Sequence, residues 1–178
     1  MLEDLASRVN SLVAVHAMLS AGRWADLRLA SLVERVAASS VSVRPGAAAL
    51  RQGEARVRVT PSPVTVTAEQ AHHLALVINE LVTNAAKYGL GARGLEIEIS
   101  IAQEGQHVRL TFRDRGPGYP PEVVQGGGRS VGLKLVESIV RLSLRGEWAL
   151  YNEGGAITEV RFPTYKASDI EEGHETQA

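Results

Sequence analysis

The chain has 178 residues, a formal net charge of −1, no cysteine and 4% aromatic residues. This charge and the low aromatic content argue against a nucleic-acid partner, and the lack of cysteine excludes disulfides and thiolate metal sites. No apolar run reaches the about 18 residues that cross a bilayer, and no signal peptide is recognisable, so we expect a cytoplasmic protein with no membrane segment.

The first part of the chain reads as two helices. In residues 2–20, apolar side chains recur at the alternating spacing of a helix–helix seam, and His16 lies on that seam. A second helix is predicted from Asp26, as its N-cap, to about Ala38, with a buried side made of Leu27, Leu29, Leu32, Val33 and Val36. Two helices cannot bury so long a seam alone, so we expect residues 1–40 to pair with further helices.

The pattern changes near Val41 to short β runs, at residues 56–59 and 64–66, followed by a long helix. This helix is expected to begin at Ala68 after the N-cap Thr67, and its apolar stripe contains Ala71, Leu74, Ala75, Ile78, Leu81, Val82 and Ala85. Residues three and four apart are neighbours on a helix, so a second, polar arc gathers Glu80, Asn84, Lys87 and Tyr88.

The polar arc has the groups that a metal ion and a phosphate require. Asn84 can supply an oxygen to Mg²⁺, which prefers hard oxygen ligands, and Lys87 can supply positive charge to a phosphate. Taken alone, the arc fits a solvated helix face equally well. The residues further along the chain favour a binding site.

A hairpin is predicted next, because residues 95–101 and 107–113 both alternate between apolar and polar side chains. Asp114 continues the inward side of the second strand, where a carboxylate is costly unless it finds hydrogen-bond donors. Gly116 and Gly118 follow, and residues 119–130 are rich in glycine and proline. We expect this stretch to be a mobile loop whose backbone can approach a ligand closely.

The last elements are a helix and a second hairpin. Ser130 is the expected N-cap of a helix over residues 131–143, whose core side comprises Leu135, Val136, Ile139, Val140 and Leu142. The free backbone N–H groups at such a helix start can bind an anion. Strands are predicted near residues 147–151 and 156–162, and the tail from 166 to 178 is expected to be flexible.

These motifs resemble a known family. Residues 41–163 are similar to the ATP-binding catalytic domain of sensor histidine kinases, an α+β fold of the two-layer α/β sandwich (Bergerat) type shared with gyrase, heat-shock chaperone and mismatch-repair ATPases. Residues 79–89 resemble the N box, 114–118 the first glycine box and 128–133 the second. The short loop between the glycine boxes is similar to that of the HWE-like group, although Asn79 stands where that group has histidine.

The resemblance implies a role for each motif residue. Asn84 would bind the Mg²⁺ that bridges the ATP phosphates, Lys87 would contact a phosphate, and Glu80 would position the metal or its water. Asp114 would accept a hydrogen bond from the exocyclic amine of adenine. Ala156 stands where the family often has threonine, and Thr158 has the parity to replace it. The other expected nucleotide contacts are Tyr88, Gly116, Gly118, Gly128, Ser130 and Gly132.

The resemblance also implies an organisation and a reaction. Residues 1–40 would be part of a dimerisation and phosphotransfer bundle, 41–165 the catalytic domain and 166–178 a tail. The enzyme would transfer the γ-phosphoryl group of Mg-ATP to a histidine outside this chain, act on a response regulator and form a homodimer through its N-terminal helices. Two alternatives share the fold, namely a non-catalytic histidine phosphotransferase or scaffold and an anti-sigma-factor Ser/Thr kinase.

Overall fold

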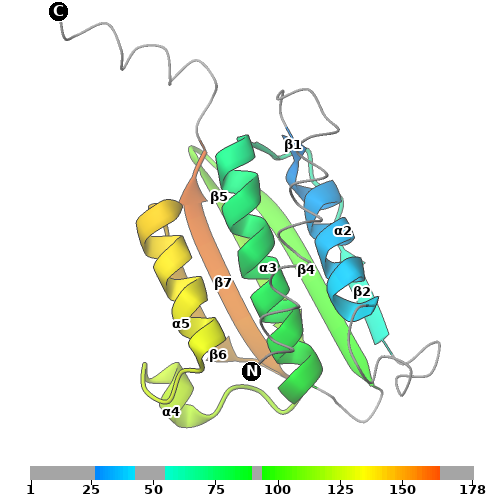
Figure 1. The fold of residues 1–178 in the computed structure, drawn as a ribbon, viewed down its shortest axis with the longest axis vertical. Helices are drawn as coiled ribbons and strands as arrows, with labels where there is room; N and C mark the ends of the chain where they lie inside the picture. The colour runs from blue at the N-terminus through cyan, green and yellow to red at the C-terminus, as the bar shows by residue number, and fades with distance from the viewer. Residues whose placement is uncertain (1–26, 43–54, 90–93, 165–178) are drawn as a thin grey trace, which may run out of the picture.

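The protein is a two-layer sandwich in which helices cover one face of a five-stranded sheet (Figure 1). The computed structural model describes residues 27–42, 55–89 and 94–164. Helices α2 (Leu29–Ser42), α3 (Ala68–Tyr88) and α5 (Val131–Ser138) lie side by side over the sheet, with α3 in the middle. The expected α+β sandwich is therefore confirmed.

The sheet has the strand order β2-β4-β5-β7-β6. The edge strand β2 (Ala55–Val59) runs parallel to β4 (Leu95–Glu104), and the remaining pairs are antiparallel. Strand β5 (His107–Asp114) pairs with β4 and with β7 (Ala156–Pro163), and β7 also pairs with β6 (Glu147–Asn152). Asp114, the last residue of β5, therefore lies at the end of a central strand.

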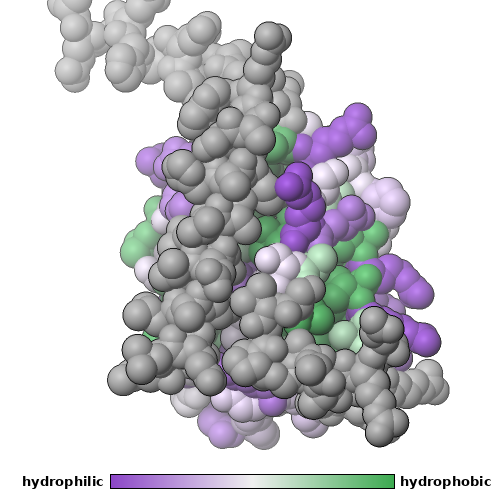
Figure 2. All heavy atoms as spheres, turned by 45° about the vertical axis from the view of Figure 1, so that its right-hand side comes forward, coloured by the Kyte–Doolittle hydropathy of each residue, from purple (hydrophilic) through white to green (hydrophobic). Residues whose placement is uncertain are grey.

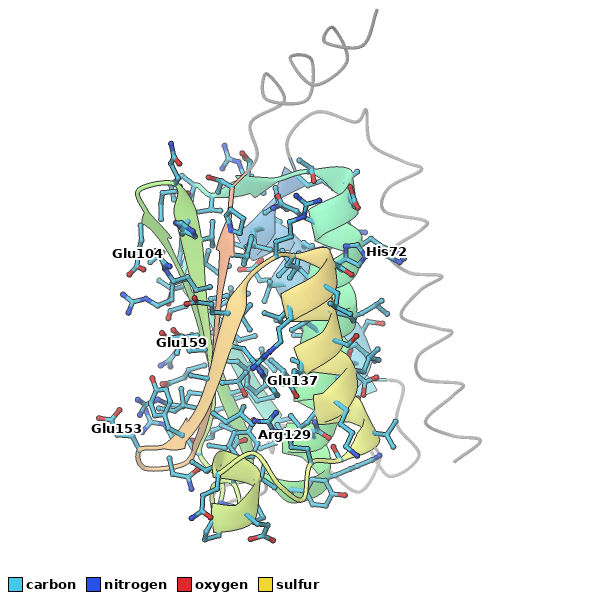
Figure 3. All side chains as sticks on the ribbon, turned by 90° about the vertical axis from the view of Figure 1, so that its left-hand side faces the viewer. His72, Glu104, Arg129, Glu137, Glu153 and Glu159 are labelled. Atoms are coloured by element: carbon cyan, nitrogen blue, oxygen red, sulfur yellow. The ribbon has the colours of Figure 1, made fainter. Side chains whose placement is uncertain are left out.

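The alternation of β4 and β5 explains why the sheet is covered on one face. Their apolar side chains are buried against the helices, while the intervening polar ones point to the other side. Figure 3 shows Glu104, Glu153 and Glu159 projecting from the sheet on the side away from the helices. There Arg109 lies 2.5 Å from Glu104, and Arg113 lies 3.3 Å from Glu153. The predicted hairpins are thus confirmed.

Helix α3 begins as the sequence predicts. The Thr67 hydroxyl accepts a hydrogen bond from Gln70 N at 3.2 Å, and the Gln70 side chain accepts one from Thr67 N at 3.3 Å. This reciprocal capping box satisfies two backbone donors that a helix start leaves unpaired. Gly89 follows the helix, and its N–H donates to Ala85 O. The long central helix is therefore fixed at both ends.

Helix α2 differs from its prediction in start, length and partner. Leu27–Arg28 (β1) is a short strand that pairs with β3 (Thr65–Val66), and the helix then continues through Val41, where β structure was expected. The Ser40 hydroxyl lies 2.9 Å from Asn79 Oδ1 of α3, and Leu29 N donates to Val64 O at 2.9 Å. Residues 1–26, with His16 and the expected cap Asp26, lie outside the described residues.

The hydrophobic core crosses the expected division between residues 1–40 and 41–165. Leu29, Val33 and Ala37 of α2 are fully buried in the same cluster as the α3 side chains and the inner face of the sheet. Burial of this kind is the main stabilising contribution in a domain of this size. Helix α2 is therefore packed as a part of the sandwich.

Helix α5 and the turn that continues it cover the predicted residues 131–143, but the last turn is not α-helical. Helix α5 ends at Ser138 and continues as a π-helical turn, η1 (Ile139–Ser143), in which Leu144 N donates to Ile139 O at 2.9 Å. The wider turn shifts the positions that follow it. Leu142, expected in the core, is 76% exposed, and Leu144 is fully buried in its place.

None of the helices in the described ranges combines the length and the apolar character that crossing a lipid bilayer requires. On the face turned forward in Figure 2, the described hydrophobic residues lie among hydrophilic ones that project at the rim.

Candidate functional site

A cavity of about 380 Å³ opens between the end of α3, the loop after β5 and the start of α5. The segment that covers it, residues 119–130, contains a short helix α4 (Pro121–Val124), where the sequence predicted only loop. Val123 of α4 is buried because it packs into the core, which explains the helical turn. The lining residues are Leu81, Asn84, Ala85, Tyr88, Gly89, Asp114, Pro117, Gly118, Tyr119, Pro120, Val123, Gly128, Ser130, Leu133 and Ala156.

Asp114 is the one acidic residue among the residues that line this cavity. Its side chain is 6% exposed, and its Oδ1 accepts a hydrogen bond from Gly116 N at 2.9 Å. Burial raises the pKa of the Asp114 carboxyl, and the backbone donors of Gly116 and Ala156 oppose that rise. A buried carboxylate that faces a cavity is suited to accept a hydrogen bond from a ligand.

Glycines bring the end of α3 against the end of β5. A Cβ on Gly116 would collide with the backbone of Gly89, and a Cβ on Gly89 would lie 2.9 Å from Asp114 Cγ. Both positions therefore need glycine, because any side chain would push the helix end away from the carboxylate. Gly118 lines the cavity and Gly116 does not.

Asn84 lines the opposite side of the cavity, on α3. Its Nδ2 atom is buried and has no hydrogen-bond partner, which is unusual because buried polar groups are nearly always paired. The side-chain amide of Asn84 is thus left with bonding capacity next to an open space. The unpaired Nδ2 group can donate to a phosphate oxygen, and the amide oxygen of Asn84 is the kind of ligand that Mg²⁺ prefers, so this residue fits a site for both.

Glu80 lies one helical turn before Asn84 and is 5% exposed. A Cβ on Gly132, at the start of α5, would lie 2.5 Å from Glu80 Oε2 and 3.7 Å from Asn84 Nδ2. Gly132 therefore lets α5 begin directly against these two side chains. Neither Glu80 nor Gly132 lines the cavity itself; both stand behind Asn84.

Two of the predicted residues on α3 have exposed side chains. Tyr88 is 67% exposed and lines the cavity, which places it at the rim. Lys87 is exposed and does not line the cavity. The structure thus brings Asn84, Tyr88 and Asp114 around one space, with Lys87 outside it.

Ser130 and Gly128 close the cavity on the side of α5. Ser130 is the predicted N-cap, and its hydroxyl accepts a hydrogen bond from Leu133 N at 3.3 Å. The backbone N–H groups at this helix start are close to the cavity and carry the positive end of the helix dipole. An anionic group of a ligand would be stabilised there.

Sequence reasoning missed Tyr119, which lines the cavity directly after the first glycine motif. Its hydroxyl lies 2.6 Å from Thr158 Oγ1, and burial raises the pKa of Tyr119 to about 12. Tyr119 N donates to Asn152 Oδ1 and Asn152 Nδ2 donates to Tyr119 O, both at 2.8 Å. Thr158, the predicted adenine contact, is fully buried behind Tyr119 and does not line the cavity. The only sequence signal for Tyr119 was its position next to Gly118.

Within the described residues, no group of three or more His, Asp or Glu side chains could hold a metal ion. A cation in this cavity would therefore depend on Asn84 together with oxygens of its ligand and of water. Mg²⁺ commonly binds in this way, through few protein ligands and substrate phosphates.

Residues 69–167 match the family model described as "Histidine kinase-, DNA gyrase B-, and HSP90-like ATPase". The chain is 32% identical over 131 residues to Sensor protein KdpD of Escherichia coli (strain K12), covering 65% of this chain and 14% of that protein. It is 26% identical over 161 residues to Blue-light-activated histidine kinase of Rhizobium johnstonii, covering 88% of this chain and 42% of that protein. The chain thus spans less than half of each relative.

Solved structures show the same fold. The histidine kinase domain of the Erythrobacter litoralis EL346 blue-light activated histidine kinase superposes with a TM-score of 0.75 at 21% identity, covering 92% of this chain and 76% of that one. The catalytic domain of histidine kinase ThkA gives a TM-score of 0.62 at 17% identity, covering 80% of this chain and 98% of that one. The chain therefore belongs to the histidine kinase-, DNA gyrase B- and HSP90-like ATPase family and carries the ATP-binding catalytic domain of a sensor histidine kinase.

Proposed function

We propose that this domain binds Mg-ATP in the described cavity and supplies its γ-phosphoryl group to a histidine outside the chain. The observation that carries the proposal is the pairing of two polar groups across one cavity. At one end stands the buried Asp114 carboxylate, and at the other stands Asn84, whose buried Nδ2 atom has no hydrogen-bond partner. A purine with an exocyclic amine and a metal-bound phosphate chain offer matching groups at the two ends.

The walls between these ends support the same orientation. Leu81, Val123, Leu133 and Ala156 provide apolar surface on which a flat base can pack, near Asp114. The phosphates would then lie toward Ser130 and the start of α5, where backbone N–H groups point at an anion. Tyr88, at the rim, is placed to contact the sugar or a phosphate. Lys87, the exposed residue before Tyr88, would contact a phosphate once a nucleotide is bound.

The residues of this chain act by positioning and by charge. Asp114 holds the base in one orientation, and Asn84 with Glu80 behind it orients the metal-binding end of the cavity. When bound, Mg²⁺ would neutralise charge on the phosphate oxygens, which is the usual requirement of phosphoryl transfer. The segment of residues 119–130 that covers the cavity is called the lid, and its residues Tyr119 and Val123 exclude water from the base. Reaction then requires only that a histidine side chain reach the γ-phosphate in line.

The relatives' names describe a sensor protein and a blue-light-activated histidine kinase, and they support a wider proposal for the whole protein. We infer a cytoplasmic homodimer that joins through its N-terminal helices and passes its phosphoryl group to a response regulator. The short lid supports a place near the HWE-like group. Asn79, which stands at that group's histidine position, is 1% exposed and lies by Ser40 of α2, away from the cavity.

Calorimetric titration of the full chain with Mg-ATP and Mg-ADP tests nucleotide binding. Binding is expected for the native sequence and should be abolished by Asp114→Ala. Asn84→Ala should remove the dependence of affinity on Mg²⁺. The matched control is Glu159→Ala, which removes a carboxylate from the face of the sheet away from the helices. A folded native chain that binds neither nucleotide would contradict the proposal.

Radiolabelled ATP tests the acceptor. Label should pass to a partner bundle that carries an acceptor histidine, and the product should be acid-labile as phosphohistidine is. Label on a serine of a partner would instead identify an anti-sigma-factor kinase. A folded chain that neither binds nucleotide nor transfers label would favour the non-catalytic histidine phosphotransferase or scaffold.

A further inference from the structure

Arg129, in the lid, does not line the cavity, unlike the residues on either side of it. It stands between Gly128 and Ser130, which both line the cavity. Its side chain is only 18% exposed, although most of the surrounding loop is exposed. In Figure 3, Arg129 and Glu137 both lie between α5 and the sheet. The arginine therefore folds inward, away from solvent and away from the ligand space.

The guanidinium group of Arg129 contacts two different elements. Its Nη1 atom lies 2.5 Å from Glu137 Oε2 of α5, and its central carbon lies 4.9 Å from the centre of the Trp148 ring of β6. An ion pair and a cation–π contact both strengthen when they are shielded from water, and here the Arg129 and Glu137 side chains are 18% and 26% exposed. The hydrogen bond from Arg129 is the main reason that the pKa of Glu137 lies below its usual value, so the carboxylate stays charged.

The lid needs such a contact because its backbone is unusually free. Gly126, Gly127 and Gly128 precede the arginine, and Gly126 and Gly128 have φ values of 94° and 57°. Consecutive glycines lose more conformational entropy on ordering than other residues. A single buried side chain just after them can fix where the lid ends and where α5 begins.

We propose that Arg129 is a positioning residue that latches the end of the lid to Glu137 and Trp148. The latch holds Gly128 and Ser130 in the cavity wall, and it keeps the N-terminus of α5 at the phosphate end. This inference rests on the proposed nucleotide function. It assigns to Arg129 an effect through the cavity wall and no contact with the nucleotide.

The test compares dissociation of Mg-ADP from the full chain and its variants, by stopped flow and calorimetry. Arg129→Gln is expected to raise the dissociation rate constant and the Kd about five- to tenfold, the effect typical of a shielded charge pair. Glu137→Gln should act in the same direction. The double variant should lose no more than Arg129→Gln alone, because both substitutions remove the same contact. Circular dichroism confirms the fold of each variant.

Arg141→Gln is the matched control. Arg141 Nη2 also contacts Glu137, at 3.2 Å, but its side chain is 63% exposed and it is not in the lid. Its removal should leave the Mg-ADP dissociation rate within about twofold of the native value, as expected for an exposed pair. An equal loss with Arg141→Gln would mean that general charge around α5 is responsible, and the latch would be rejected.

Trp148 provides a second readout that a merely structural role would not give. The chain has 2 tryptophans, so Trp24→Phe leaves Trp148 as the sole tryptophan emitter. Its emission should change on adding Mg-ADP, and Arg129→Gln should remove most of that change. The inference alone would be overturned if the native chain binds Mg-ADP but Arg129→Gln changes neither the Mg-ADP dissociation rate nor the response of Trp148 emission. The proposed function would then still stand. A native chain that binds no nucleotide would overturn the proposed function itself.

Discussion

The Tyr119 hydroxyl and the Thr158 hydroxyl share a hydrogen bond of 2.6 Å behind the wall of the cavity. Thr158 is fully buried, so its Oγ1 has no access to water. Tyr119→Phe should therefore lower the free energy of unfolding by about 1–3 kcal/mol, the cost of a buried hydroxyl left without its partner. Thr158→Val should lower the free energy of unfolding by a similar amount, because it leaves the Tyr119 hydroxyl without its partner.

The double variant Tyr119→Phe with Thr158→Val distinguishes this explanation from loss of packing. With both hydroxyls removed, neither substitution leaves the other hydroxyl buried and unpaired, and stability should return close to the native value. Denaturant unfolding monitored by circular dichroism measures all three variants. Additive losses in the double variant would show that packing, and not the hydrogen bond, accounts for the single losses.

Asn79 and Asn84 lie on the same helix but on different faces, which predicts opposite effects of the same substitution. Asn79 is 1% exposed and contacts Ser40 of α2, so Asn79→Ala should lower the free energy of unfolding by about 1–3 kcal/mol. The Mg-ADP affinity of the Asn79→Ala variant should be unchanged. Asn84→Ala should leave stability nearly unchanged, because Asn84 Nδ2 has no partner to lose, and should weaken Mg-ADP binding.

Thermal unfolding and calorimetry on the same two preparations check this contrast. Each asparagine variant serves as the control for the other, since the residue type, the helix and the substitution are the same. Loss of nucleotide affinity in a folded Asn79→Ala protein would contradict the assignment of Asn79 to the interface with α2.

Gly132→Ala tests how tightly α5 begins against α3. The new methyl group would lie 2.5 Å from Glu80 Oε2, a side chain that is itself buried. We expect a loss of about 1–3 kcal/mol in stability from overpacking, together with weaker Mg-nucleotide binding because Glu80, which stands behind Asn84, must shift. Denaturant unfolding and calorimetry measure the two effects.

Gly127→Ala is the matched glycine control. A methyl group at Gly127 would lie 3.4 Å from its nearest neighbour, Glu122 O. Gly127 is also exposed in the lid. It should therefore change stability by less than about 0.5 kcal/mol, as is usual for surface substitutions. Equal effects at both glycines would indicate that lost backbone freedom, and not the contact with Glu80, is responsible.

Asp114 predicts a pH dependence with a definite sign. Burial raises the pKa of its carboxyl in the folded protein above the unfolded value, so the folded state binds the proton more tightly. Between these two pKa values, stability without nucleotide should fall as pH rises, relative to Asp114→Asn. Above the raised pKa and below the usual pKa, the difference in stability between the native protein and Asp114→Asn should no longer depend on pH.

Nucleotide affinity should follow the opposite course. The ionised carboxylate is the acceptor for the base, so Mg-ADP affinity should fall as pH is lowered through the raised pKa of Asp114. Asp114→Asn should bind weakly at every pH and should lack this step. Unfolding and binding measured from pH 4 to pH 8 test both trends, and identical pH profiles for the two proteins would refute them.

Local patterns were enough to predict most of the fold. The Thr67 cap, the alternation of β4 and β5 and the Ser130 cap each depend on a few neighbouring residues, and the structure confirms all three. The cavity residues Asn84 and Asp114 were also found, because a polar arc on a helix and a carboxylate on an inward position are visible in sequence.

The errors share a different origin, since they depend on contacts between distant parts of the chain. Leu27–Arg28 is a strand only because Thr65–Val66 lies beside it, and α2 joins the catalytic core only because α3 covers it. Leu142 is exposed because of one π-helical turn, which no periodicity rule anticipates. Tyr119 enters the site through partners about three dozen residues away, Asn152 and Thr158.

The membership of α2 in the shared core has a practical consequence for expression of the isolated kinase module. A fragment that began at residue 41 would lack the side chains of Leu29, Val33 and Ala37 and would expose their apolar counterparts on α3 to water. Such a surface favours self-association and poor solubility. Fragments meant for crystallisation or inhibitor screening should therefore begin ahead of Leu27, so that both strands of the β1–β3 pair are retained.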